Sequence, residues 1–530
     1  MTKARVLVTD RVSEDGIEML RTEADVDVRF GISPAELLEI IPNYEALVVR
    51  SETKVTADIL AAGRNLVVVG RAGVGVDNID VDAATRHGVI VVNAPAAITV
   101  ATAEHTVGLM IALARHIPAG DASLKAGRWD RSKLVGVELR GKTLGIIGLG
   151  RIGSQVARVA RAMEMNVIGF DPGIGPERFA NLGVGVATLE EVLRQSDFIT
   201  LHAILPPGSR HLLDDAQFAM LKPGARLINV ARGSLINETA LLNALNSGAV
   251  GGAALDVYAQ EPVPADSELT HHPKVVATPH LGASAAEAQE RVGVDVAEQI
   301  LGIFRGEPAM YAVNLPSVGA EAFKVIAPYL EAATDAASLA MQLSSGGQFQ
   351  SVEIEYLGEL SNFDITPLRA SIIKGLLEPI SEEHVTLVNA ALIAEQRGMK
   401  IVEKMGSYEG GIYKDLIRVH LLTSSGKTTV SATVGHDGPH IAEINDFWVD
   451  ISPGQGHMLI CENLDAPGMI GKIGTFLGEK GINISFMRVG REEDKDRALM
   501  VLGLDSDVDE DVLAEILRIP NIFSAVTARL

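Results

Sequence analysis

Cysteine and long hydrophobic runs are what this sequence has least of. Cys461 is the only cysteine in 530 residues, so an internal disulfide is excluded. The start of the chain, Met1 to Val8, lacks the apolar core of a signal peptide, and both observations predict a reducing, cytoplasmic location. The best apolar run, Val107 to Ala114, falls short of the roughly 20 residues of a membrane helix, so we expect a soluble protein.

Positive charge is also in short supply. The 46 Lys and Arg residues face 68 Asp and Glu residues, which gives a formal net charge of −22, and no run of basic residues offsets it locally. Such a charge repels nucleic acid and anionic membrane surfaces. We therefore expect neither as a partner.

Length and composition favour several folded domains. At roughly 100–200 residues per domain, the chain predicts three or four units. Apolar residues make up 47% and charged residues 22%, which are ordinary values for folded chains. Wholesale disorder is not expected.

Apolar, β-rich segments alternate with helical segments through the first 280 residues. Strands that are apolar on both faces and separated by helices predict a parallel sheet covered on both sides. A helical segment from Ala101 to Arg115 interrupts this alternation, so we predict two such sheets in series, with a switch near residue 100. The predicted strands are Val6–Val8, Val26–Val28, Ala46–Val49, Leu66–Val69 and Val89–Val92, then Thr143–Ile147, Val167–Phe170, Phe198–Leu201, Arg226–Val230, Ala253–Leu255 and Val275–Ala277.

The last third of the chain has a different pattern. From about residue 318, longer helical stretches precede hairpins such as 416–420 against 428–432, which is typical of an α+β domain. After a turn-rich linker at 452–456, residues 457–530 follow the order β-α-β-β-α-β. The predicted fold class is α/β, with two Rossmann-like doubly wound parallel-sheet domains, an α+β domain and a ferredoxin-like (βαββαβ) domain.

A glycine motif stands between a predicted strand and a predicted helix. Gly148, Gly150 and Gly153 have the GxGxxG spacing, in which the glycines permit a tight turn, close approach of the pyrophosphate and close helix packing. Asp171 follows eighteen residues after Gly153, where a carboxylate can bind ribose hydroxyls and would repel a 2′-phosphate. These features predict NAD rather than NADP. The alternative is a glycine-rich turn in an ordinary α/β domain.

Three polar residues, Arg232, Glu261 and His280, follow later strands of the second sheet. Carboxyl ends of parallel strands face the ligand crevice, so we expect the three to converge there. Oxidation of an alcohol by hydride transfer needs a base, and imidazole titrates near the working pH. A carboxylate can orient that imidazole, and a guanidinium can grip a substrate carboxylate. The alternative is that His280, one of 13 histidines, is an ordinary surface residue.

These segments together resemble the D-isomer-specific 2-hydroxyacid dehydrogenase family. The resemblance is carried by Gly148–Gly153 with Asp171, by Asn229–Gly233, by Asp256–Pro262 and by Thr278–Ser284. Length and the C-terminal unit narrow it to the long-form (type 1) D-3-phosphoglycerate dehydrogenases, and it covers the whole chain.

The resemblance implies roles for the site residues. His280 would be the general acid/base, Glu261 its partner and Arg232 the substrate anchor. The implied NAD contacts are Val74, Gly148, Gly150, Arg151, Ile152, Gly153, Asp171, Val230, Ala231, Arg232, Asp256, His280, Leu281, Gly282 and Ala283. The implied domains are a substrate-binding domain (1–97 and 281–316), an NAD-binding Rossmann domain (98–280), an intervening domain (318–452) and an ACT domain (457–530).

A phosphorylated and carboxylated substrate needs several cations. Arg50 and Arg71 each follow a strand of the first sheet and face the predicted cleft. The resemblance matches both to substrate contacts, together with Ser51 and Gly73, and matches Arg131 to a contact supplied by a neighbouring subunit. The alternative is that these are solvated arginines.

One loop departs from the family pattern. Where family members often continue with a Thr- or Lys-containing, Pro-rich loop, residues Ala203 to Pro207 read Ala-Ile-Leu-Pro-Pro. A hydroxyl contact with the cofactor is therefore in doubt there, while backbone contacts can still form.

The C-terminal unit resembles an ACT domain, a small-molecule sensing module that pairs edge to edge with a second copy. The resemblance is carried by Asn463–Gly468, which leads into a helix, and by Gly481–Ser485. Free amides at the helix start can receive an amino acid carboxylate, and Asp465 with Asn483 can hold its polar groups. Asn463 is placed in the same allosteric site, whose effector in the family is L-serine. The alternative is a module that only assembles the oligomer.

The resemblance implies NAD-dependent oxidation of D-3-phosphoglycerate to 3-phosphohydroxypyruvate, the first step of phosphorylated L-serine biosynthesis. It implies a homo-oligomer, dimer or tetramer, with feedback by L-serine; a side activity on 2-hydroxyglutarate belongs to the same expectation. No metal is expected. Two alternatives stay open: a dehydrogenase for another small D-2-hydroxy acid, and a non-catalytic NAD-binding sensor.

Overall fold

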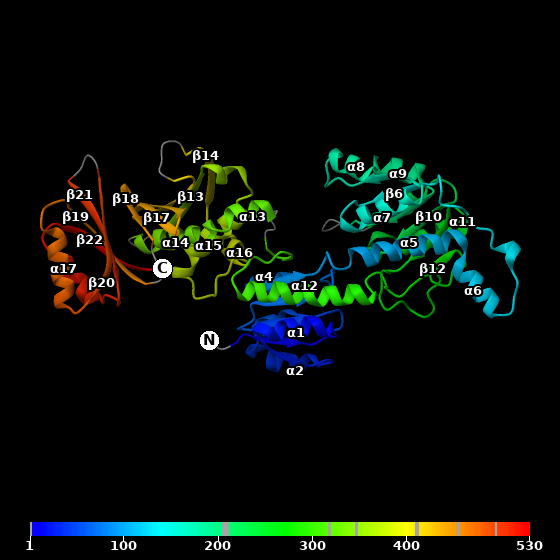
Figure 1. The fold of residues 1–530 in the computed structure, drawn as a ribbon, viewed down its shortest axis with the longest axis horizontal. Coiled ribbons are helices and arrows are strands. Elements are labelled where there is room, and N and C mark those ends of the chain that lie inside the picture. Colours follow the sequence, from blue (N-terminus) through cyan, green and yellow to red (C-terminus); the bar gives the residue numbers. More distant parts are fainter. Residues whose placement is uncertain are drawn as a thin grey trace.

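The computed structural model describes residues 3–203, 211–315, 320–344, 348–408, 413–452, 456–492 and 496–530, which form four β-sheets (Figure 1). The two N-terminal sheets are parallel and the two C-terminal sheets contain antiparallel strands, so the predicted fold class is confirmed. Within the described ranges, no helix is both long and apolar enough to cross a membrane.

The first sheet has five parallel strands in the order β2-β1-β3-β4-β5. A helix from much later in the chain, α12, packs on α1, and a Cβ on Gly16 would lie only 2.6 Å from the backbone of Gly293. The elements are β1 (Arg5–Val8), α1 (Glu14–Glu23), β2 (Asp25–Val28), α2 (Pro34–Ile40), β3 (Ala46–Val49), α3 (Ala57–Ala62), β4 (Val68–Arg71), α4 (Val81–Arg86), β5 (Ile90–Asn93) and α12 (Ala286–Phe304).

The second sheet has seven parallel strands in the order β12-β11-β10-β9-β6-β7-β8. The strand order changes direction between β6 and β9, because β7 and β8 lie on one side of β6 and β9 to β12 on the other, and ligands of open parallel sheets bind at such a switch point. The elements are α5 (Thr99–Arg115), α6 (Ile117–Lys125), β6 (Thr143–Ile147), α7 (Arg151–Ala162), β7 (Asn166–Phe170), α8 (Pro176–Leu182), β8 (Gly185–Val186), α9 (Leu189–Gln195), β9 (Phe198–Leu201), α10 (Asp215–Phe218), β10 (Ala225–Asn229), α11 (Glu238–Ser247), β11 (Val250–Leu255) and β12 (Val275–Ala277).

The third sheet is mixed, in the order β14-β13-β15-β16-β17-β18, and only β13 and β14 pair in parallel. The predicted hairpin is confirmed, because Ile417 pairs with Ala432. The elements are α13 (Ala320–Ile326), α14 (Tyr329–Leu343), β13 (Phe349–Leu357), α15 (Thr366–Leu377), α16 (Ala390–Gln396), β14 (Ile401–Gly406), β15 (Leu416–Thr423), β16 (Gly426–Gly435), β17 (Gly438–Ile444) and β18 (Phe447–Ile451).

The fourth sheet is antiparallel with the order β20-β21-β19-β22, the arrangement predicted for a ferredoxin-like unit. Alternate residues of β19 face opposite ways: Met458 and Ile460 join the core of α14 and the third sheet, whereas Leu459 and Cys461 face α17 and α18. The last two sheets therefore share one core. The elements are β19 (His457–Leu464), α17 (Met469–Glu479), β20 (Ile484–Arg491), β21 (Arg497–Leu504), α18 (Glu510–Ile516) and β22 (Ile522–Arg529).

Candidate active site

The glycine motif forms a cradle between β6 and α7. At Gly148, where φ is +93°, a Cβ would lie 2.5 Å from the His202 carbonyl oxygen, and at Gly153 a Cβ would lie 2.0 Å from that of Gly148. Both positions therefore require glycine. Gly150 caps α7, and a Cβ there would meet nothing within 4 Å, so the open space lies where a pyrophosphate can approach the helix N-terminus.

Asp171 follows β7 beside this cradle. Its Oδ2 accepts a hydrogen bond of 2.8 Å from the Leu149 amide, and its Oδ1 accepts one of 2.9 Å from the Gly173 amide. A carboxylate oxygen can accept a further bond, so both remain available to ribose hydroxyls. A cavity of about 290 Å³ adjoins the carboxylate. These residues fit a dinucleotide.

The three predicted catalytic residues follow neighbouring strands. The last residues of β10, β11 and β12 pair side by side, so the segments that carry Arg232, Glu261 and His280 leave the same edge of the sheet. His280 Nδ1 lies 2.7 Å from Glu261 Oε2, and the Tyr258 amide donates to Glu261 Oε1 at 3.0 Å. Because Nδ1 is engaged by the carboxylate, proton exchange with a ligand falls to Nε2.

Asp256, one of the predicted NAD contacts, lies buried just after β11. Its side chain has no exposed surface, and it accepts hydrogen bonds from His105, Thr278, Leu281 and Gly282. Burial raises the pKa of Asp256, but these hydrogen bonds outweigh burial and hold the pKa below its usual value. Three of these bonds fall on Oδ1 and only the Gly282 amide donates to Oδ2, so Oδ2 keeps an acceptor position, and the NAD contact of Asp256 stays a prediction.

Asn229 holds the loop that carries Arg232. The buried Asn229 side chain accepts from the Ala231 amide at 3.0 Å and donates to the Arg232 carbonyl at 2.9 Å. At Gly233 a Cβ would lie 2.0 Å from the Tyr258 backbone, so this turn requires glycine. The sequence argument included Asn229 in a motif but gave it no role.

Three arginines from both parallel sheets come together. The pKa of Arg71 is lowered by burial and then by the nearby guanidinium groups of Arg232 and Arg50. The Gly73–Gly75 segment packs against two of them, since a Cβ on Gly75 would lie 2.6 Å from Arg232 Nη2. Among the described residues, the buried Arg71 Nε has no hydrogen-bond partner. Such a cluster fits an anionic ligand.

Asp10 shapes the loop beside this cluster, and the sequence argument missed it. Asp10 Oδ2 accepts from the amides of Arg50 at 2.6 Å and of Glu52 and Thr53 at 3.1 Å. The side chain is buried. The available signal was an aspartate two residues after a strand, at the edge where ligands bind.

The remaining predicted NAD residues lie around the same edge. Val230 and Ala231 follow β10, Leu281 is 40% exposed beside the buried Gly282, and Ala283 follows. Arg151 and Ile152 start α7, and the Arg151 guanidinium lies 5.1 Å from the centre of the Tyr311 ring in the returning segment. Val74 lies in the loop of the arginine cluster. Of the unusual loop, Ile204 to Pro207 lie outside the described residues.

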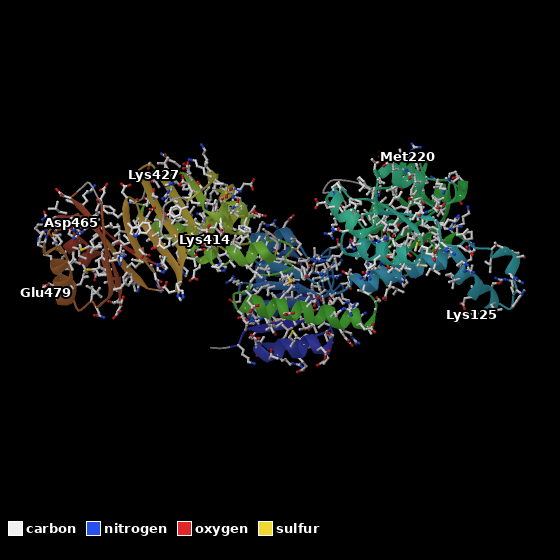
Figure 2. All side chains as sticks on the ribbon, turned by 45° about the horizontal axis from the view of Figure 1, so that its top comes forward. Lys125, Met220, Lys414, Lys427, Asp465 and Glu479 are labelled. Atoms are coloured by element: carbon white, nitrogen blue, oxygen red, sulfur yellow. The ribbon has the colours of Figure 1, made fainter. Side chains whose placement is uncertain are left out.

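Arg131 does not join the arginine cluster within one chain. It is exposed and follows α6, which projects away from the first sheet (Figure 1). Large apolar side chains on this arm are also exposed: Trp129 is 82% and Val135 78% accessible. Figure 2 places Lys125, at the end of α6, and Asp465 at opposite ends of the molecule.

The predicted effector residues do not meet within one chain either. Asn463 pairs with Ala498, whereas Asn483 precedes Ile484, which pairs with Leu504. Six strand residues at about 3.3 Å each separate these levels by roughly 20 Å. Asp465 pairs with Arg491 at the Asn463 end, so Asp465 and Asn483 lie far apart in a single copy, and a ligand shared by them stays a prediction for paired copies.

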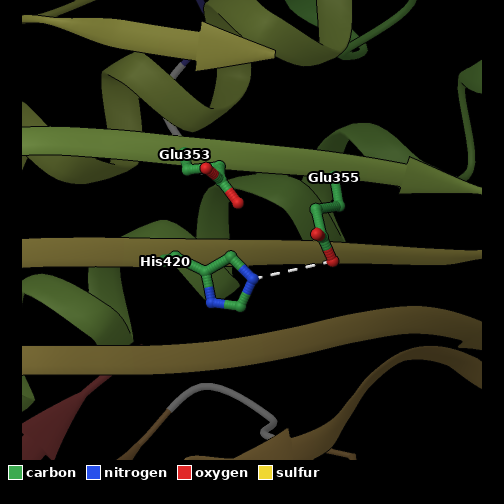
Figure 3. Close-up of side chains that lie close together, drawn as sticks. All are labelled: Glu353, Glu355 and His420. Atoms are coloured by element: carbon green, nitrogen blue, oxygen red, sulfur yellow. Dashed lines mark ion pairs between the residues drawn. The ribbon is translucent and has the colours of Figure 1, made fainter. Parts of the chain in front are cut away.

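A second cluster lies on the third sheet. Glu353, Glu355 and His420 present possible metal ligands within 4.8 Å of one another, with His420 Nε2 3.6 Å from Glu355 (Figure 3). Lys404 already binds Glu353 at 2.7 Å and Arg418 binds Glu355 at 3.2 Å. A metal ion would have to displace both cations, so we assign none.

Comparison with known proteins matches three segments. The D-isomer specific 2-hydroxyacid dehydrogenase NAD-binding domain matches residues 107–282, the D-3-phosphoglycerate dehydrogenase intervening domain residues 325–445, and the ACT domain residues 457–521.

Curated relatives and solved structures agree. D-3-phosphoglycerate dehydrogenases of Bacillus subtilis and Methanocaldococcus jannaschii are each 44% identical, with 98% of both chains covered. A protein structure from Thermus thermophilus matches at a TM-score of 0.54 and 35% identity, covering 58% of this chain and 99% of that one. An Escherichia coli D-lactate dehydrogenase matches at 0.52 and 26% identity, covering 58% and 99%. The chain therefore belongs to the D-3-phosphoglycerate dehydrogenase family, and it is an NAD-dependent oxidoreductase.

Proposed function

We propose that this chain oxidises D-3-phosphoglycerate to 3-phosphohydroxypyruvate, the first step of phosphorylated L-serine biosynthesis. The observation that carries the proposal is the 2.7 Å contact between His280 Nδ1 and Glu261. The segments that carry these two residues leave the same edge of the sheet as the segment that carries Arg232. The names of the relatives supply the substrate.

Proton transfer is assigned to His280. Its Nε2 takes the proton of the substrate C2 hydroxyl, and Glu261 stabilises the charged ring and fixes its orientation. Arg232 binds the substrate carboxylate and polarises the carbonyl that forms. When bound, NAD accepts the hydride from C2.

Substrate phosphate is assigned to the arginine cluster. Arg71 lies close enough to both Arg232 and Arg50 for repulsion between the guanidinium groups, which a dianion would relieve. Ser51 and Gly73 lie in the adjoining loops. Because the net charge of −22 opposes an anion, attraction must come from this local cluster.

The NAD site is assigned to the cradle of Gly148, Gly150 and Gly153, with Asp171 on the ribose. The other proposed contacts are Val74, Arg151, Ile152, Val230, Ala231, Arg232, Asp256, His280, Leu281, Gly282 and Ala283. We expect Asp171→Ala to narrow the preference for NAD over NADP by about tenfold, the cost of one charge-assisted contact. An unchanged ratio of the two dissociation constants would contradict the assignment.

Assembly as a homo-oligomer is the next part of the proposal. The exposed apolar arm after α6 carries Trp129 and Val135, and large exposed apolar patches mark interfaces. A partner bound to this arm would bring Arg131 near a second copy. Sedimentation tests the homo-oligomer. The sequence-based domain boundaries also stay part of the proposal, as does the cytoplasmic location, which cell fractionation tests.

Feedback by L-serine is proposed for a site between two ACT domains. Asn463 Oδ1 is buried without a hydrogen-bond partner among the described residues. Asn463 and Asn483 lie at opposite ends of the fourth sheet, so a two-fold pairing of copies would bring one end against the other. We expect serine to inhibit the wild type and Asn463→Ala to remove the inhibition; equal inhibition of both would contradict the site.

A substrate panel tests the reaction. We expect D-3-phosphoglycerate to give at least tenfold higher kcat/KM, followed by NADH absorbance, than D-lactate, D-glycerate or D-2-hydroxyglutarate. A higher value for one of these would establish a different 2-hydroxy acid as substrate. No NADH from any of them, despite NAD binding, would establish the non-catalytic sensor.

A further inference from the structure

Both chain crossings between the parallel sheets touch one buried carboxylate. Helix α5 begins where the chain enters the second sheet, and residues 278–282 lead back toward α12 (Figure 1). Asp256, just after β11, lies between these crossings without exposed surface. Its side chain therefore ties together the two segments that set how the parallel sheets are joined.

The returning crossing is held on both sides of His280. Asp256 accepts from Thr278 Oγ1 at 2.6 Å, from the Leu281 amide at 2.7 Å and from the Gly282 amide at 2.8 Å. The His280 amide itself donates to the Asp256 carbonyl at 2.9 Å. His280 has a left-handed φ of +56°, which is unfavourable in a non-glycine residue without support. The surrounding hydrogen bonds hold it there.

His105 supplies the contact from the entering crossing. Its Nε2 lies 3.2 Å from both Asp256 Oδ1 and Thr278 Oγ1. Thr278 donates its own proton to Asp256, and an ionised carboxylate only accepts. The shared proton therefore belongs to His105 Nε2, which makes the imidazole a donor to both partners.

We propose that His105 is a positioning residue for the dehydrogenase reaction: through Asp256 it holds the backbone of His280 where proton transfer to substrate requires it. This inference rests on the proposed function, which gives His280 its role. A small displacement of a reacting group lowers turnover more than binding. A histidine that served only stability would change the melting temperature and leave turnover of the folded enzyme unchanged.

Replacement of His105 separates these roles. We expect His105→Leu to lower kcat by about tenfold while KM and the NAD dissociation constant stay within twofold, because the substrate and cofactor contacts remain. His105→Gln places an amide N–H near the position of Nε2 and should recover kcat to within about threefold of wild type. His271→Gln, on an exposed loop of the same unit, is the matched control.

A second variant and a direct measurement cover a folding defect. The double variant His105→Leu/Thr278→Val should lose no more activity than the worse single variant, because both act on one junction. Hydrogen exchange of the Leu281 and Gly282 amides should rise about tenfold in His105→Leu, and this measurement needs no substrate. Unchanged exchange, or kcat of His105→Leu within twofold of an active wild type, would overturn the inference. An inactive wild type would instead reject the proposed function. Hydrogen exchange of the Leu281 and Gly282 amides would then still show whether His105 holds this backbone in place.

Discussion

The two N-terminal sheets and the two C-terminal sheets are joined in different ways. Each parallel sheet has its own hydrophobic clusters: one pair flanks the first sheet, another the second, and no cluster of described residues includes strands of both. The last two sheets share one cluster that runs from Ile326 to Ala528. The catalytic half therefore has separate cores for its two sheets, whereas the C-terminal half is a single body with one core for both.

The two halves also touch each other. The Thr386 hydroxyl donates to the Gly88 carbonyl at 3.2 Å, just after α4, and a Cβ on Gly88 would lie 2.7 Å from that hydroxyl. The C-terminal body thus contacts the sheet that carries Arg50 and Arg71.

The largest effect should come from the catalytic half. We expect His280→Ala to lower kcat by roughly 10²–10⁴-fold, the usual contribution of a positioned acid/base. Steady-state NADH production measures it, with His271→Gln as control. Turnover equal to wild type would remove His280 from the mechanism.

The shared core can be broken at one residue. Ile460→Ala empties a buried position between the fourth sheet and α14, and the lost burial plus the cavity should cost about 2–5 kcal/mol. Calorimetry should show one transition, for both C-terminal sheets, moving to lower temperature, while the catalytic half is unaffected.

A matched variant sharpens this test. Ile470→Ala truncates a side chain that is 54% exposed on α17 and should have little effect. If Ile460→Ala instead split the transition, so that only the fourth sheet melted early, the two sheets would be independent units.

The arginine cluster draws on both parallel sheets and should distinguish substrates. Arg71→Gln should lower kcat/KM for D-3-phosphoglycerate about 10–100-fold more than for D-glycerate, because a hydrogen bond to a charged group contributes about 1.5–3 kcal/mol. The exposed Arg64→Gln is the control. Equal losses on both substrates would reject the phosphate role.

The smallest expected effect is a pH-dependent one in the C-terminal body. Burial, and then the charge of Glu331, raise the pKa of Asp335 on α14 to about 6. The pKa of this carboxyl is lower in the unfolded chain, so folding takes up a proton at pH values between the two pKa values. The contribution of Asp335 to the free energy of unfolding is therefore lost as pH rises toward 6. Asp335→Asn should therefore stabilise the body by about 1 kcal/mol at pH 7.5, after allowance for solvent screening, and by less at pH 5.

Thermal unfolding at both pH values checks this. The exposed Asp446→Asn should leave stability unchanged at either pH. A gain for Asp335→Asn that is equal at pH 5 and pH 7.5 would show that the carboxyl does not titrate as expected.

Local pattern carried much of the fold and part of the site. Alternation of apolar strands and helices predicted both parallel sheets, and the positions of Gly148 to Gly153, Asp171, Glu261 and His280 after strands predicted one ligand edge. The short strand β8 and the start of β4 at Val68 were not predicted. Strand β8 has only two residues, too few to show a periodicity, and the start of β4 depends on where its neighbouring strands pair with it.

The type of each layer and the chemistry available at strand ends could be predicted from the amino-acid order, because periodicity and strand-to-loop order are local properties. Which groups meet depends on the packing of the folded chain. Asp10 and Asp256 organise loops from distant segments. Asn463 and Asn483 lie at opposite ends of the fourth sheet, and the last two sheets share a core. These outcomes depend on contacts between residues far apart in the chain, and no local spacing encodes them.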